Sequence, residues 1–443
     1  MTTTELKRTI GRTDLAVLVV GSVIGSGIFL VPGGVLAQCG GSLPLASAVW
    51  LLGGALSLMG ALTYGELSAM NPGAGGLYLY LRDAFGRLPA FLYGWTIFLV
   101  ICPGTVATLA VGSAAYAEQF ASVGVWGQRL IAGVIIASLV VLNVRGTRLS
   151  IVAMNLATAL KVGALAFLIL ALPLFAGPRP AGTTPALHFD LSLLSAVGLA
   201  MISVLWAYEG WGYVTFIAGE VKDPQRTLPS GLAIGTLALV VIYTLVNLAY
   251  VAALGTAGVA ASTRVAADAV NAVFGPRAAA LIAIPIIIAM TSAAHSVLLT
   301  MPRAFFAMAR DGVFFERLGE VHPRFGTPAL AIVSGGFVAL VLAMLGTFQQ
   351  LLSVVTFIAW VFYGLAGASI FVFRRRMPGA SSTYRVPGYP VTPFLFVVSA
   401  AAIVGNAIYS QPPMQTVLGL GLVGLGIPAY WIWNRGARRE PQA

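Results

Sequence analysis

The chain has 443 residues, of which 58% are hydrophobic and only 9% are charged, whereas an ordinary soluble domain carries roughly 25% charged residues. So few charges cannot cover the surface of a soluble globule of this size. The two cysteines and the lack of a Gly/Pro period also exclude a disulfide scaffold and a collagen-like chain. The composition therefore predicts a polytopic membrane protein, and the net charge of +11 does not by itself indicate a nucleic-acid partner.

The hydropathy pattern predicts twelve membrane-spanning helices, because a helical span needs about 20 apolar residues. In chain order, spans 1 to 12 cover residues 13–38, 44–70, 88–117, 129–144, 148–175, 193–218, 230–254, 278–308, 328–346, 349–373, 391–410 and 413–434. Span 1 lacks a small-residue cleavage site, so we interpret it as a permanent span rather than a signal peptide. The expected fold class is an all-α membrane protein with no large soluble domain.

The distribution of positive charge predicts the orientation of these spans. With the N-terminus inside, 20 of the 25 Lys and Arg residues fall in cytoplasmic segments, four in outer segments, and one, Lys161, inside a span. An excess of Lys and Arg marks the cytoplasmic side, so both termini, residues 1–12 and 435–443, are predicted to be cytoplasmic. The sequence has no Asn-x-Ser/Thr site, which fits a bacterial inner (plasma) membrane.

Two spans are interrupted by glycine near their middle. Span 1 contains Gly21, Gly25 and Gly27, and span 6 contains the segment 207–212 with Glu209 beside Gly210. Each glycine weakens a helix by about 1 kcal/mol relative to alanine. Broken helices five spans apart and opposite in direction are typical of an inverted repeat. We therefore predict five-helix repeats over 13–175 and 193–373, followed by two further helices over 391–434.

These breaks predict a binding site at mid-membrane, because hydrocarbon cannot satisfy the backbone groups that an unwound helix frees. Free N–H groups and the positive end of the outer half of span 1 suit a carboxylate, and free carbonyl groups suit an ammonium group. A zwitterionic α-amino acid satisfies both. The expected substrate-binding residues are Val23, Ile24, Gly25, Ser26, Gly27, Ile28, Trp206, Ala207, Tyr208, Glu209 and Gly210. Trp206 is either an aromatic lid over the substrate or a packing residue.

Several motifs, in order along residues 10–435, resemble the amino acid–polyamine–organocation superfamily, and within it the L-type amino-acid transporters and their bacterial relatives. The motifs are Gly25-Ser26-Gly27-Ile28-Phe29 with Pro32, Tyr64-Gly65-Glu66-Leu67 with the segment 73–78, Tyr208-Glu209-Gly210-Trp211 with the segment 219–229, the segment 303–312, and the segment 384–393. The resemblance implies a LeuT-type fold of 5+5 inverted repeats, with helices 1 and 6 broken, that works by alternating access.

The sequence departs from the animal L-type transporters at two places. Those proteins have a cysteine in the outer loop between spans 3 and 4 that links them to a heavy-chain glycoprotein, and the loop from Gln119 to Gln128 has none. A disulfide-linked heavy chain is therefore not expected, and a monomer is the expected unit. Glu209 stands where the animal transporters have a small residue, which leaves the range of substrates open.

Ionisable residues at membrane depth are candidates for coupling transport to an ion. Lys161 lies in span 5, where a charge costs about 2.5–3.5 kcal/mol. In the family that the chain resembles, a lysine here takes the place of a sodium ion between spans 1, 5 and 8. The alternative is a lysine that reaches the membrane interface. Glu209 is the second candidate, because a carboxyl group beside the break could carry a proton.

Two other sets of polar residues have open interpretations. His295 in span 8 is either a hydrogen-bonded packing residue or a pocket-lining or proton-handling one. Glu66 and Glu220 lie near cytoplasmic helix ends and many arginines, and form either gating ion pairs or solvated charges. There is no nucleotide-binding loop and no catalytic or metal-binding cluster, so neither an enzyme nor a cofactor is expected.

The expected function is sodium-independent secondary transport of small or medium neutral L-amino acids, by exchange or proton symport. One alternative is an antiporter for basic amino acids or polyamines, in which Glu209 meets the second cationic group. The other is a sensor that binds amino acids without transporting them.

Overall fold

The computed structural model describes residues 10–71, 73, 75–145, 147–177, 190–376, 384–410 and 412–437. Within these residues the regular elements are helices, and an isolated bridge pairs Ile10 with Val221. Most of the N-terminal segment 1–12 and the end of the C-terminal segment 435–443 lie outside the described residues.

The helices follow one another with short connections. They are α1 (Arg12–Val23), α2 (Gly27–Leu30), α3 (Pro32–Gln38), α4 (Leu43–Met70), α5 (Leu77–Phe85), α6 (Arg87–Thr96), η1 (Ile97–Ile101), α7 (Cys102–Ala117), α8 (Gly124–Arg145), α9 (Thr147–Phe175), α10 (Leu191–Ala207), η2 (Trp211–Glu220), α11 (Pro224–Ala261), α12 (Val265–Phe274), α13 (Pro276–Thr300), α14 (Pro302–Arg310), η3 (Glu316–Gly319), α15 (Ala329–Leu345), α16 (Phe348–Arg376), α17 (Val391–Ser410) and α18 (Pro413–Ala437). Of the three η elements, η1 is a π-helical turn and the other two are 3₁₀ helices.

The predicted membrane spans are present as helices. Eleven helical stretches among the described residues are long and apolar enough to cross a membrane, and α15 is a shorter apolar helix of 17 residues. Together they correspond to the twelve predicted spans, so the all-α membrane fold is confirmed. Span 4, predicted over 129–144, is longer than expected, because α8 begins at Gly124 and has 22 residues.

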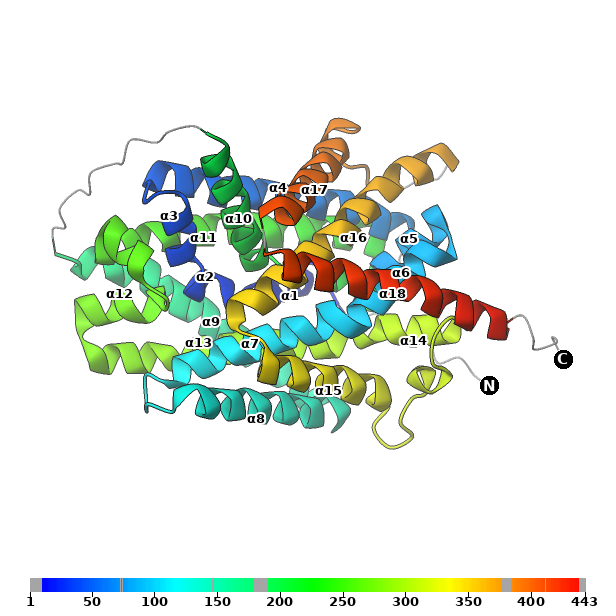
Figure 1. The fold of residues 1–443 in the computed structure, drawn as a ribbon, viewed down its shortest axis with the longest axis horizontal. Helices are drawn as coiled ribbons and strands as arrows, with labels where there is room; N and C mark the ends of the chain where they lie inside the picture. The colour runs from blue at the N-terminus through cyan, green and yellow to red at the C-terminus, as the bar shows by residue number, and fades with distance from the viewer. Residues whose placement is uncertain are drawn as a thin grey trace.

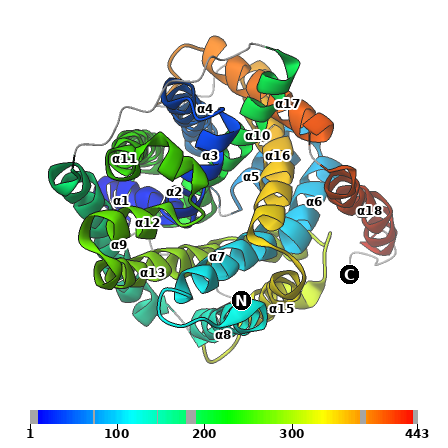
Figure 2. The ribbon, with the colours of Figure 1, turned by 60° about the vertical axis from the view of Figure 1, so that its left-hand side comes forward.

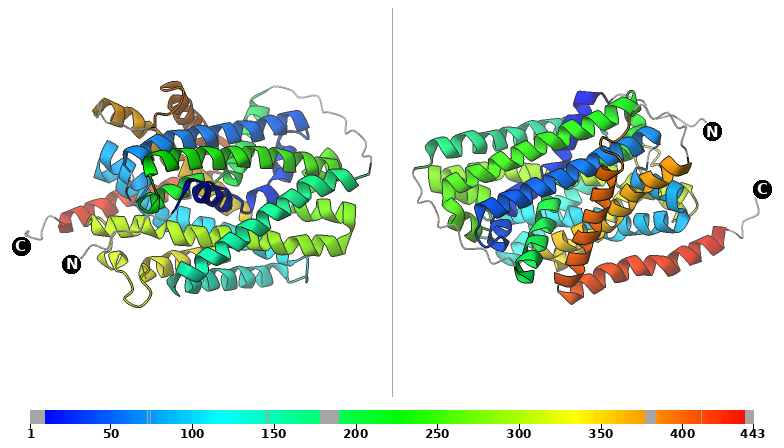
Figure 3. Two further views of the ribbon diagram at one scale, coloured as in Figure 1. Left: turned by 180° about the vertical axis from the view of Figure 1, so that it is seen from behind. Right: turned by 90° about the horizontal axis from the view of Figure 1, so that it is seen from above.

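The short helix α1 lies inside the bundle rather than at its edge. It packs against α11, α13, α9 and η2, and in the left panel of Figure 3 the dark blue α1 lies between the green α11 and the yellow-green α13. The long helices run roughly along one direction in Figure 1, whereas α16 is tilted across them. Figure 2 shows α17 and α18 at the periphery. The first broken span is therefore enclosed by the other helices.

A buried ion pair joins three segments at the end of the bundle where α4 finishes. The guanidinium group of Arg374 on α16 donates to both carboxylate oxygens of Glu66 on α4, at 2.8 and 2.7 Å. The backbone N–H of Val386, ahead of α17, also donates to Glu66. Glu66, which is 1% exposed, is therefore paired rather than solvated. The side chain of Glu220 is not among the described parts of the structure, so its predicted ion pair stays a prediction.

Candidate functional site

Span 1 unwinds between α1 and α2. The first half ends at Val23, Ile24 has an extended conformation, and the second half begins at Gly27. Within the described part of the chain, no acceptor is recorded for the backbone N–H groups of Gly25, Ser26, Gly27 and Ile28. Because buried backbone donors are nearly always paired, four donors without a recorded acceptor make this break a candidate binding site.

Span 6 breaks in the same way. Helix α10 ends at Ala207, and the chain continues as the 3₁₀ helix η2 from Trp211. Gly210 has a φ of 121°, which side chains other than hydrogen disfavour. No donor is recorded for the carbonyl groups of Ala207 and Tyr208 within the described residues. The second break therefore offers free acceptors where the first offers free donors.

The two breaks are in direct contact. A Cβ atom added to Gly27 would lie 2.3 Å from Cα of Ala207, and one added to Gly210 would lie 2.9 Å from the carbonyl oxygen of Ser22. The indole N–H of Trp206 donates to the hydroxyl of Ser26 at 3.0 Å. The glycines predicted from sequence thus allow two unwound backbones to meet at one point.

A small cavity of about 20 Å³ lies at this contact. It is lined by Ser22, Val23, Gly25, Ser26, Gly27, Thr105, Leu109, Trp206, Glu209, Tyr213, Ala293 and Val297. Six of the predicted substrate-binding residues are among them, namely Val23, Gly25, Ser26, Gly27, Trp206 and Glu209. A cavity of this size holds about one water molecule, so a larger ligand requires the lining to move.

The other five predicted residues are adjacent to the cavity without lining it. Ile24 and Ile28 are fully buried among neighbouring helices, and Ala207 lies behind Gly27. The ring of Tyr208 packs against Trp50 and Tyr243, and Gly210 faces Ser22. These residues shape the backbone of the breaks without lining the small cavity.

Residues from two continuous helices complete the lining of the small cavity, and none of them is among the residues predicted from the sequence. Thr105 and Leu109 come from α7, and Ala293 and Val297 come from α13. Each pair is spaced by four residues, so both members lie on one face of a helix. Because apolar residues at that spacing are ordinary in any membrane span, this signal does not distinguish a cavity from helix packing.

Glu209 is held by a tyrosine from span 10. The hydroxyl of Tyr363 on α16 donates a short hydrogen bond to Oε1 of Glu209, and Tyr213 on η2 lies beside the same carboxylate. Glu209 also lines the small cavity. Its carboxylate is thus both partnered by the protein and within reach of a ligand.

Lys161 on α9 reaches the unwound part of span 1. Its Nζ atom donates to the carbonyl oxygen of Gly21 at 2.6 Å and to that of Ile24 at 3.1 Å. The side chain is 1% exposed, so it does not reach the membrane interface. A third carbonyl group of this segment, that of Val23, accepts from the hydroxyl of Tyr243 at 3.3 Å. Three freed carbonyl groups of span 1, those of Gly21, Val23 and Ile24, are therefore satisfied by side chains of the protein.

His295 on α13 lines neither the small cavity nor the larger cavity that adjoins it at Ser22 and Tyr213. It is 3% exposed, and its Nδ1 atom lies 2.8 Å from the side-chain nitrogen of Asn143 on α8. The neighbouring Ser296 lies 3.3 Å from Ser22, oxygen to oxygen. This geometry supports the packing interpretation of His295.

A larger cavity of about 750 Å³ leads away from the small one toward the N-terminal end of α1. Ser22 and Tyr213 line both cavities, and Asp14 and Arg303 lie in the larger one. On the opposite side the hydroxyl of Tyr116 donates to the carbonyl oxygen of Phe29 at 2.9 Å. A Cβ atom on Gly33 would lie 2.1 Å from the carbonyl oxygen of Ser262. The site is therefore open toward one face of the bundle and tightly packed toward the other.

The sequence is similar over nearly its whole length to proteins that carry amino acids. A family model described as amino acid permease matches residues 10–421. The serine/threonine exchanger SteT of Bacillus subtilis is 32% identical, over 96% of this chain and 97% of that protein. The human cystine/glutamate transporter is 29% identical, over 98% of this chain and 87% of that protein. The human large neutral amino acids transporter small subunit 2 is 30% identical, over 96% and 80%.

We predict that Gly27→Ala lowers the thermal midpoint of the purified protein in detergent, because the new Cβ overlaps Ala207 and overpacking costs about 1–3 kcal/mol. Gly34→Ala on α3 is the matched control, since its Cβ meets nothing within 4 Å, and its midpoint should not fall. Equal midpoints for the two variants would contradict the close contact of the two breaks.

Proposed function

The chain belongs to the amino acid permease family, and from this premise we propose that it is a sodium-independent secondary transporter of small or medium neutral L-amino acids. The observation that carries the proposal is the contact of two broken spans, one with free N–H groups and the other with free carbonyl groups. The substrate carboxylate binds the N–H groups of Gly25 to Ile28. The substrate ammonium group binds the carbonyl groups at the end of α10.

The lining of the small cavity favours a neutral substrate over a basic one. Leu109, Ala293 and Val297 supply apolar walls, which suit an apolar or small polar side chain. Glu209 is the one acidic residue of that lining, and it already accepts a hydrogen bond from Tyr363, which satisfies part of its capacity. The similarity to a serine/threonine exchanger supports the same size class.

The positions of the cavities support alternating access. If both termini are cytoplasmic, as the excess of Lys and Arg on that side indicates, the larger cavity opens to the cytoplasm and this conformation faces inward. Transport then requires the repeats 13–175 and 193–373 to rearrange around the small cavity. The absence of cysteine between Gln119 and Gln128 supports transport without a disulfide-linked heavy chain.

The proposal is tested by counterflow exchange of labelled serine in proteoliposomes, with each of the twenty amino acids as competitor. Alanine, serine and threonine should compete best, leucine less, and arginine and putrescine not at all. Competition by arginine but not by alanine would identify the basic amino-acid antiporter instead. Serine binding without any counterflow would identify a sensor.

Lys161 is proposed to couple the state of span 1 to transport. Its ammonium group holds the end of α1 through hydrogen bonds to the carbonyl groups of Gly21 and Ile24. A bound metal cation coordinated by the same carbonyl groups would hold this segment in the same way. A lysine that stays charged makes the protein an exchanger, whereas one that releases its proton during the cycle makes it a proton symporter. We favour exchange.

We predict that Lys161→Ala lowers the initial rate of serine exchange about tenfold or more, since hydrogen bonds to charged groups are worth ~1.5–3 kcal/mol. Serine binding, measured by scintillation proximity, should fall much less. Lys222→Ala is the control, because Lys222 is exposed ahead of α11. A fully active Lys161→Ala protein would show that the hydrogen bonds of Lys161 have no role in transport.

We also predict that Glu209→Gln changes the dependence of exchange on external pH between about 5 and 8 while preserving the hydrogen bond from Tyr363. Glutamine has the same shape as glutamate but cannot take up a proton. Tyr363→Phe, which removes the donor but keeps the carboxyl group, should shift the pH profile rather than flatten it. If Glu209→Gln matches the wild type in both pH profile and substrate range, Glu209 is not a coupling residue.

A further inference from the structure

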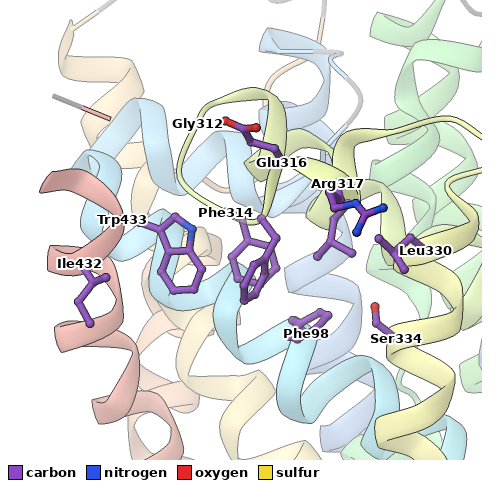
Figure 4. Close-up of a pocket in the computed structure, with 11 residues that line it drawn as sticks. Phe98, Gly312, Phe314, Glu316, Arg317, Leu330, Ser334, Ile432 and Trp433 are labelled. Carbon is purple, nitrogen blue, oxygen red and sulfur yellow. The ribbon is translucent and has the colours of Figure 1, made fainter. Parts of the chain in front are cut away.

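A second large cavity lies far from the broken spans, between α15 and α18. Its volume is about 980 Å³, at the upper end of the ~300–1,000 Å³ range of ligand sites. The lining residues come from η1, the loop after α14, η3, α15 and α18, and Figure 4 shows the labelled side chains between the two flanking helices. We call it the α15–α18 cleft.

The wall of the α15–α18 cleft is aromatic. Trp433 of α18 is stacked on Phe314 at 5.7 Å between ring centroids, and Phe315 meets the edge of the same indole at 4.8 Å. Phe98 lies edge-on to Phe314 at 5.2 Å. Ile432 and Leu330 at the mouth are 70% and 44% exposed. Such a surface suits a hydrocarbon chain, and both flanking helices correspond to predicted membrane spans.

One cationic group is available at the polar end of the cleft. Arg317 on η3 lines the cleft and is exposed, and no ion pair or hydrogen bond from its side chain is recorded within the described residues. Figure 4 places its guanidinium group toward Leu330 and Ser334, whereas the Glu316 carboxylate lies at the rim beside Gly312. A guanidinium group forms paired hydrogen bonds with a phosphate. No ion pair between Glu316 and Arg317 is recorded among the described residues.

We propose that the α15–α18 cleft binds one anionic phospholipid, with the headgroup phosphate on Arg317 and an acyl chain along Trp433, Phe314 and Phe98. Charge complementarity favours an anionic lipid. The segment 303–324 carries four arginines and three acidic residues, of which Asp311 is paired with Arg82. Basic groups between membrane helices on the cytoplasmic side select anionic headgroups. This assignment rests on the proposed orientation, with the segment 303–324 in the cytoplasm.

The proposal is tested by native mass spectrometry of the detergent-purified full chain, equilibrated with equal amounts of phosphatidylglycerol and phosphatidylcholine of the same acyl composition. The wild type should retain one phosphatidylglycerol, with a preference of about fivefold over phosphatidylcholine. Arg317→Gln should abolish that preference. Arg324→Gln, which removes the same charge from a loop residue stacked on Phe325, should keep it.

A second variant tests the apolar part of the cleft. Ser334→Phe places a ring inside the cleft, and it should reduce retention of both lipids at an unchanged thermal midpoint. Equal retention of the two lipids by the wild type would overturn the proposal, as would identical behaviour of the two arginine variants. An adduct with the mass of a polypeptide would assign the cleft to a protein partner instead. The measurement involves no transport, so its failure would leave the proposed transport function untouched.

Discussion

The ammonium group of Lys161 holds the backbone where span 1 unwinds, and the arrangement of the site depends on it. Carbonyl groups that leave a helix inside a membrane have no water to bind, and each unpaired group costs several kcal/mol. Lys161 satisfies two of them, and Tyr243 satisfies a third. The lysine is in turn stabilised by these carbonyl groups, since it is buried and has no carboxylate partner among the described residues. The ammonium group therefore stabilises the unwound segment, and the freed carbonyl groups stabilise the buried charge.

The partners at the two breaks support the proposed amino-acid substrate. At the first break side chains satisfy three carbonyl groups, whereas the N–H groups of Gly25 to Ile28 have no recorded acceptor among the described residues, which suits a carboxylate. The second break, which touches the first at Gly27 and Ala207, leaves carbonyl groups open for a donor. An α-amino acid carries the two groups on one carbon atom, Cα, and only the space beyond them distinguishes one side chain from another.

The residues of this site that could be predicted from the sequence are those that are unusual in a membrane helix. Glycines at mid-span, an acidic residue beside one of them and a lysine inside another span are all unfavourable in a plain membrane helix. The structure brings Gly27, Glu209 and Lys161 into one neighbourhood. The twelve spans were also predictable, because hydrocarbon thickness fixes their length, although the start of α8 was placed five residues too late.

The other residues that line the small cavity could not be predicted, because their types and spacing are those of any apolar membrane helix. Leu109, Ala293 and Val297 are ordinary residues of ordinary membrane helices, and only the packing of α7 and α13 around the breaks brings them to the cavity. The hydrogen bond between Tyr363 and Glu209 joins residues 154 positions apart. Conversely, Ile24, Ile28 and Tyr208 were placed in the site because they are adjacent in sequence to the breaks. A residue next to a broken helix need not line the small cavity, as these three show.

The central claim is that a tethered ammonium group replaces a bound sodium ion at the unwound segment of span 1. The most direct measurement is the initial rate of serine exchange by the wild-type protein in proteoliposomes, with sodium replaced by choline on both sides of the membrane. The account predicts the same rate in the two media, because Lys161 is covalently present in both. A rate that falls to the level of protein-free liposomes in choline, and returns when sodium is restored, would contradict it.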